Sequence, residues 1–266
     1  MTQSRRDDVA DFWDAALADW IAGQPVTDPD LKRWQAGYSG TGKGSVDLGQ
    51  YPDPYVGDLR GVETEPRLVV LGLNPGIGYE KLQGRDGIWT RRIAERGYSR
   101  TFDRSPEGDP ESWLATHGKR SPYWVKMAYF AQRWLDDPAA TPAHILNFEL
   151  FPWHSPAKTA HMQIPPDLIH RYVWGPIQEV NVTEVFAFGA DWFAICQQLG
   201  LERIAMFGHG GEPISGLEEN RAKWRLGVYR LPSGQRVVAS AQSGNSTPPG
   251  PSRLAIMREL VASATA

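Results

Sequence analysis

Apolar and polar residues alternate in blocks along this chain, and four of the blocks are short, apolar and rich in Val, Leu, Ile, Ala and Phe. Short apolar runs bounded by turn residues are typical of strands that are buried on both faces, as in a parallel sheet. We therefore predict four strands, at residues 67–73, 144–150, 184–189 and 236–241.

A second pattern, in which apolar residues recur three or four positions apart, predicts helices between and around these strands. The first helix is expected over residues 7–22 and ends before Gly23, which acts as a stop signal. Further helices are expected at residues 123–135, 166–180 and 251–264.

Strands that alternate with helices call for parallel βαβ units. We therefore predict an α/β fold, with residues 1–266 forming a single three-layer α/β/α domain around a central, mostly parallel four-stranded sheet. Residues 23–66 are rich in Gly, Pro and Asp, so we expect a long loop that packs with the first helix on the core of residues 67–264. Right-handed crossovers place the loops after the strands along one sheet edge, where function is expected.

Composition narrows the class of protein. Of the 266 residues, 41% are hydrophobic and 22% are charged, which is typical of a globular chain. The single cysteine, Cys196, excludes an internal disulfide and multi-cysteine metal sites and fits a reducing cytoplasm. No apolar segment is long enough for a membrane span or a signal peptide, so we expect a cytoplasmic protein without membrane contact. We also expect a monomer that needs neither a metal nor a cofactor.

The net charge of −3 argues against a protein that coats nucleic acid by bulk electrostatics. Locally, residues 81–104 hold seven basic and three acidic side chains, an excess of four positive charges. This excess indicates either a phosphate-binding surface or a solvated helix face. Arg91 and Arg92 are the DNA-contact candidates in this segment.

The loop after the first predicted strand reads Gly72-Leu73-Asn74-Pro75-Gly76. Glycines allow the backbone to approach a ligand and proline fixes the turn, so this loop presents Asn74 rigidly at the sheet edge. It resembles the first motif of the uracil-DNA glycosylase superfamily, in its mismatch-specific and single-strand-selective branches. The resemblance implies that the loop binds an extruded base and that Asn74 positions the hydrolytic water. The alternative is a strand-to-helix turn without chemistry.

Two further features follow in the order that the superfamily has. An aromatic residue past the motif stacks on the base in that family, and Trp89 lies fifteen positions past Asn74, with Tyr79 as the competing candidate. The second predicted strand holds Asn147, where the family's asparagine reads the polar edge of the base. An amide suits this role because it offers a donor and an acceptor. Core aromatics and a strand-end asparagine are the alternatives.

The family's second motif, which pinches phosphates and penetrates the duplex, is expected directly after the fourth strand. The DNA-contact candidates there are Gln242, Ser243, Gly244, Asn245 and Ser246. Some branches place a histidine here that stabilises the departing base, and this chain has none. That role is left to Gln242, to backbone N–H groups, or to His154 from a neighbouring loop.

Glu149 lies two residues past Asn147, and this spacing on a strand puts both side chains on one face. We interpret Glu149 as a candidate general base, the alternative being an ion-paired glutamate at the strand edge. No lysine adjoins the first motif to act as an amine nucleophile, which favours hydrolysis without strand cleavage.

These observations predict a monofunctional DNA glycosylase that flips out a uracil, mismatched or modified base and leaves an abasic site. One alternative is a glycosylase specific for hypermodified cytosine in phage DNA, with a role in defence against phage. Another is a nucleic-acid-binding module without catalytic activity.

Three other patterns carry less weight. The segment 37–45 resembles a phosphate-binding loop but lacks the Ser/Thr and the preceding strand, so nucleotide hydrolysis is not expected. Asp53 lies in an Asp-Pro-Tyr sequence similar to that of the uracil-specific branch, again without a preceding strand. We interpret it as a turn residue, with a place in the pocket wall as the alternative. His154, His161 and His170 match no metal-site spacing.

Overall fold

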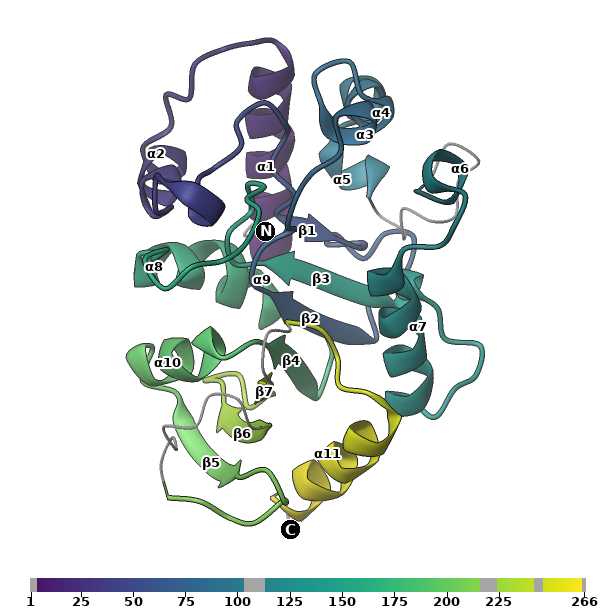
Figure 1. Ribbon diagram of the computed structural model, residues 1–266, viewed down its shortest axis with the longest axis vertical. Helices are drawn as coiled ribbons and strands as arrows, with labels where there is room; N and C mark the ends of the chain where they lie inside the picture. The colour runs from purple at the N-terminus through teal and green to yellow at the C-terminus, as the bar shows by residue number, and fades with distance from the viewer. Residues whose placement is uncertain (1–3, 103–112, 216–223, 242–245, 265–266) are drawn as a thin grey trace.

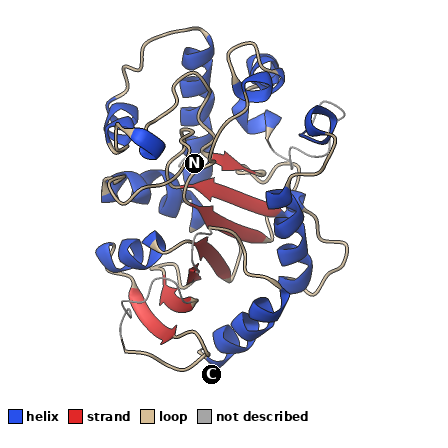
Figure 2. Ribbon diagram, viewed as in Figure 1, coloured by secondary structure: helices blue, strands red, loops and turns tan. Residues whose placement is uncertain are grey.

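The computed structural model describes residues 4–102, 113–215, 224–241 and 246–264. Its centre is a mixed sheet of seven strands in the order β1-β3-β2-β4-β7-β6-β5 (Figure 1). Helices surround this sheet (Figure 2), so the class is α/β, as the alternation of patterns predicted.

The four strands predicted from the apolar runs form the parallel centre of the sheet. They are β3 (Ile145–Glu149), β2 (Leu68–Gly72), β4 (Glu184–Phe188) and β7 (Arg236–Ala241). Each pairs in parallel with the next in that order, and Gly72 lies opposite Glu149 in the register. This register brings the carboxyl ends of β2 and β3 to the same height at one edge.

The sheet has three more strands than the four predicted, because antiparallel strands extend it at its two edges. They are β1 (Tyr55–Val56), β5 (Glu202–Phe207) and β6 (Arg225–Arg230). β1 is two residues long, too short to show a periodicity. β5 begins with exposed residues and β6 has an arginine at each end, so neither is a continuous apolar run.

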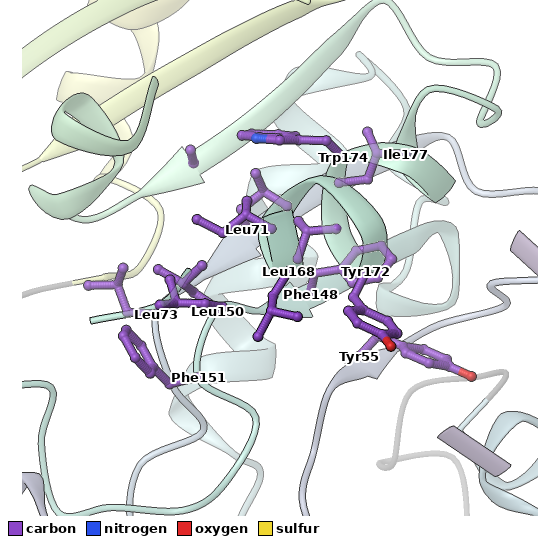
Figure 3. Packing of buried hydrophobic residues seen from close by; sticks show 14 of the residues in the cluster. Tyr55, Leu71, Leu73, Phe148, Leu150, Phe151, Leu168, Tyr172, Trp174 and Ile177 are labelled. Carbon is purple, nitrogen blue, oxygen red and sulfur yellow. The ribbon is translucent and has the colours of Figure 1, made fainter. Parts of the chain in front are cut away.

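Side chains of the central strands alternate between two hydrophobic layers. Val69 and Leu71 face a layer that contains α1 (Arg5–Ile21) and α10 (Asp191–Gln198), part of which is shown in Figure 3. The same layer holds α8 (Pro166–Ile169), a π-helical turn (His170–Trp174) and α9 (Gly175–Ile177), which follow one another without a break and together form most of the helix expected over residues 166–180.

Leu68 and Val70 face the opposite layer, which α7 (Pro122–Trp134) and α11 (Pro251–Ser263) cover. The segment directly after β2 contributes Leu82 and Trp89 to the layer of α1, as α8 after β3 contributes Leu168, whereas α7 crosses the opposite face just before β3. In open α/β sheets, ligands bind outside the carboxyl ends of the strands. A binding site is therefore expected at the carboxyl ends of β2 and β3.

The expected loop over residues 23–66 contains more structure than the composition indicated. It includes α2 (Pro29–Ala36), a 3-10 turn (Gly42–Gly44) and the edge strand β1. Asp28 caps α2 by accepting hydrogen bonds from the backbone N–H groups of Asp30 and Leu31. Leu31 and Trp34 are buried in the same layer as α1, so the helix forms because its one apolar face is covered.

The described part of the connection from β2 to β3 holds four short helices that the sequence patterns did not predict. They are α3 (Glu80–Gln83), α4 (Ile88–Arg96), α5 (Tyr98–Thr101) and α6 (Trp113–His117). Within the described residues, every helix is too short or too polar to cross a lipid bilayer.

Candidate functional site

A cavity of about 480 Å³ opens at the carboxyl ends of β2 and β3, and we call it the carboxyl-edge cavity. Its walls come from the loops that follow these two strands, from α3 to α7 and from the segment before α11. Nine of the predicted site residues line it, namely Gly72, Asn74, Pro75, Tyr79, Trp89, Asn147, Glu149, His154 and Ser246. Folding thus gathers candidates that are up to 174 positions apart, from 72 to 246, around one space.

Asn74 is held from the neighbouring loop. Its Nδ2 donates to the backbone oxygen of Ser155 at 3.1 Å and to the Oγ of Ser155 at 2.9 Å. The N–H of Ser155 in turn donates to the carbonyl of Gly76 at 3.1 Å. These bonds fix the amide by its nitrogen, and Oδ1 has no partner in the part of the chain that the structure describes. Asn74 therefore offers the cavity a fixed acceptor.

Asn147 lies on β3 and is only 2% exposed. Its Oδ1 accepts from the hydroxyl of Tyr123 on α7 at 2.8 Å, and its Nδ2 donates to Oε1 of Glu149 at 3.1 Å. In this orientation the amide oxygen faces Tyr123 and the amide nitrogen faces Glu149. Since the oxygen is already engaged, the group that Asn147 retains for a ligand is the second hydrogen on Nδ2.

Glu149 is buried beside Gly72 of the paired strand. Its Oε1 accepts from Asn147, whereas Oε2 is shielded from solvent and has no hydrogen-bond partner within the described ranges. Burial raises the pKa of Glu149 to about 8, the hydrogen bond from Asn147 lowers it, and the charge of Asp53 raises it. The alternative of an ion-paired glutamate is wrong, because the described residues place no basic side chain on this carboxyl group.

His154 connects the two loops of the site. Its Nδ1 lies 3.1 Å from the carbonyl of Gly76, which only accepts, so Nδ1 carries a hydrogen. In the neutral ring Nε2 is then an acceptor, and Nε2 of Gln83 donates to it at 3.0 Å and to Oδ2 of Asp53 at 2.6 Å. Both ring nitrogens are engaged by the protein. His154 therefore holds the walls together, and its ring has no nitrogen to spare for a departing base.

Aromatic side chains form much of the remaining wall. Trp89, on α4, is 7% exposed and contacts Phe102 edge to face, with ring centroids 5.8 Å apart. Tyr79 is 40% exposed and stands edge-on to Trp113 at 4.6 Å. Trp89 thus lies within the wall, whereas the exposed Tyr79 and the half-buried Trp113 form an aromatic pair that also lines the cavity.

Four predicted site residues lie away from the cavity. Leu73 packs into the hydrophobic layer shown in Figure 3, since the alternation of the strand turns it to the face opposite Gly72 and Asn74. Gly76 has a φ of +80°, which glycine adopts without strain, and contributes its carbonyl to the loop contact. Arg91 is exposed on α4 and donates to the carbonyl of Asp86, and Arg92 on the same helix is half-buried.

The predicted phosphate-contacting loop is described only in part. Ser246 lines the cavity, together with Thr247, whereas Gln242, Ser243, Gly244 and Asn245 lie outside the described residues. Of the other histidines weighed in the sequence, His161 and His170 are exposed and His154 alone belongs to the site.

Sequence reasoning missed several residues of the site, above all Gln83, Tyr123 and Ser155, and it gave a place in the pocket wall only as the alternative for Asp53. Asp53, interpreted as a turn residue, lines the cavity and accepts from Gln83. A signal was present, because the Asp-Pro-Tyr sequence around it matches a branch of the family, but the missing strand argued against it. For Ser155 the signal was its position in the loop that follows β3, two residues beyond Trp153.

Gly72→Ala is expected to destabilise the protein by about 1–3 kcal/mol, the usual range for an overpacked site. A β-carbon at this position would lie 2.3 Å from Oε2 and 2.6 Å from Oε1 of Glu149, so the carboxyl group has to move. Urea denaturation measures the cost. The matched control is the same substitution in a Glu149→Asp background, where the shorter acid relieves the clash and the cost falls. An unchanged denaturation midpoint in Gly72→Ala alone would contradict the packing of this pair.

No model of a known protein family matches the chain, and comparison with curated proteins finds no match either.

Proposed function

We propose that this chain is a monofunctional DNA glycosylase, which extracts a base from DNA and hydrolyses its N-glycosidic bond. The observation that carries the proposal is the convergence of a fixed amide acceptor, a buried carboxyl group and aromatic walls around one cavity at the carboxyl edge of the sheet. The parallel centre of the sheet, with the Asn74 loop at the end of its first strand, also supports the resemblance to the uracil-DNA glycosylase superfamily.

The chemistry needs an oriented water and donors near the departing base. When the N-glycosidic bond breaks, positive charge develops on the sugar and negative charge on the base. The Oδ1 of Asn74 accepts a hydrogen bond from a water and directs the water's lone pair at C1′. An amide does not take the proton as a carboxylate would, so a modest rate is expected.

The dimensions and composition of the cavity suit an extruded base. Its volume of about 480 Å³ lies within the range of roughly 300–1,000 Å³ found for sites that bind small molecules. Trp89, Phe102 and Trp113 provide apolar walls, and stacking on aromatic rings offsets part of the cost of removing a base from the helix. The volume suits uracil and leaves room for a larger, modified base.

The cavity walls also favour simple hydrolysis. Within the described ranges no lysine lines the cavity, so the site offers no side-chain amine that would attack C1′ and cleave the strand. The expected product is an abasic site in an intact DNA strand.

The test is a gel assay on single-stranded and duplex oligonucleotides that carry one uracil, and on phage DNAs whose cytosines are hypermodified. The purified chain should produce breaks only after alkali treatment, and mass spectrometry should detect the free base. Breaks without alkali would contradict the monofunctional mechanism. If none of these DNAs loses a base, the proposed function is wrong.

A further inference from the structure

Three polar side chains on one side of the carboxyl-edge cavity form a directional chain of hydrogen bonds. The hydroxyl of Tyr123 donates to Oδ1 of Asn147, and Nδ2 of Asn147 donates to Oε1 of Glu149. Each bond points towards the carboxyl group. The chain ends at Oε2, which has no partner in the described part of the molecule and is shielded from water.

A buried polar atom without a partner is uncommon in folded proteins and indicates a functional or unfilled position. Glu149 lines the carboxyl-edge cavity, so a ligand bound in this cavity can supply the missing hydrogen-bond partner of Oε2. Since Oε1 already accepts, the neutral carboxyl group carries its proton on Oε2 and presents it as a donor.

We propose that Glu149 acts as a neutral acid, whose Oε2–H donates to the departing base and stabilises the negative charge that develops there. This inference rests on the proposed glycosylase function and assigns the group that stabilises the leaving base. It replaces the general-base role predicted from the sequence, which needs the ionised form. It also explains how the site works although both nitrogens of His154 are engaged.

The proton balance closes with water alone. The C1′–N bond breaks and its electron pair stays on the base, while a lone pair of the water forms the new C1′–O bond. The Oε2 proton passes to the base, and a proton released by the attacking water restores the acid. The net reaction adds OH to C1′ and H to the base.

The surroundings of Glu149 favour the neutral form at neutral pH. Asp53 lines the same cavity, and its charge opposes ionisation of Glu149, as does burial. Tyr38 and Tyr123 are the tyrosines near this carboxyl group, and burial raises the pKa of each hydroxyl well above the usual range, so both stay neutral. Tyr79 and His154 are the other titratable groups among the described residues of the wall, and no lysine or arginine in those residues lines it.

The test compares wild type, Glu149→Ala, Glu149→Gln and the surface control Glu202→Gln in single-turnover base release, at pH values on both sides of 8. The acid is protonated below its pKa, so the wild-type rate should be constant below pH 8 and fall above it. Glu149→Ala should lose about 10²–10³-fold at neutral pH, the usual cost of removing one such donor. Glu149→Gln keeps a donor, so it should lose less and show no fall above pH 8.

Each outcome bears on one of the two proposals. A wild-type rate that rises through pH 8, or a Glu149→Ala variant with an unchanged rate, overturns the acid role while the glycosylase function stands. Absence of base release by the wild type from every DNA overturns the proposed function and the acid role with it. A second readout needs no DNA: the infrared difference between wild type and Glu149→Gln at neutral pH should show a protonated carboxyl band. A carboxylate band alone overturns the acid role.

Discussion

Asn74→Ala is expected to lower the rate of base release by about 10²–10³-fold, in the range for removing a group that orients a reactant in the transition state. Two hydrogen bonds from Nδ2 to Ser155 hold the amide. The direction from which its Oδ1 accepts a hydrogen bond is therefore fixed. Without it, a water in the cavity samples many orientations and few of them place its lone pair at C1′. Single-turnover base release from an oligonucleotide with one uracil, or from the phage DNA that proves active, measures the loss.

The matched control is Asn181→Ala, which removes an exposed amide before β4, at the amino end of the sheet. It should leave the rate unchanged. The thermal midpoint of Asn74→Ala should stay close to that of wild type, because Asn74 is half-buried and contacts a loop. Wild-type rates in a folded Asn74→Ala variant would refute the water-orienting role.

Trp34→Ala is expected to destabilise the protein by about 3–5 kcal/mol, the usual cost of truncating a buried tryptophan. Trp34 lies on α2 and is 1% exposed. Its ring contacts those of Trp13 and Tyr172, with centroids 5.6 Å and 5.4 Å apart, and its Nε1 donates to the carbonyl of Leu150 at 2.9 Å. Removing it leaves a cavity where α1, α2 and the end of β3 meet, which urea denaturation should detect.

Trp34→Phe separates packing from hydrogen bonding in the same position. The variant keeps an aromatic ring but loses the donor to Leu150. It should lower the free energy of unfolding by less than Trp34→Ala does. Roughly 1–3 kcal/mol of that loss should come from the buried acceptor left without a partner. If Trp34→Ala cost less than about 1 kcal/mol, below the usual range for truncating a buried tryptophan, α2 would not be an integral part of the core.

The sequence predicted the centre of the fold well, because that part depends on local pattern. The apolar runs at residues 67–73 and 144–150 correspond to β2 (Leu68–Gly72) and β3 (Ile145–Glu149) within one residue at each end. A strand buried on both faces has a continuous apolar signal, and the turn residues mark its end. The position of Asn74 at the sheet edge followed from the same pattern and is confirmed.

The parts that sequence reasoning missed depend on contacts between distant segments. β1 is a two-residue strand that exists because Tyr55 and Val56 pair with Phe148 and Asn147. Asp53 enters the cavity wall because the chain just before β1 is drawn to the end of β3, where its N–H donates to the carbonyl of Pro152. The burial of Glu149 likewise depends on its neighbour Gly72, and neither relation has a local signature.

The same dependence sets the order in which the site is assembled. The bond between Asn74 and Ser155 joins residues 81 positions apart, and contacts of such separation form only after the intervening chain has been brought together. While a ribosome is still producing the segment between them, the amide has no anchor and the cavity lacks its second wall. A nascent chain shorter than β3 and its following loop therefore lacks Asn147, Glu149 and the anchor of Asn74, and the cavity wall is complete only after Ser246 and Thr247, which follow β7, have joined it.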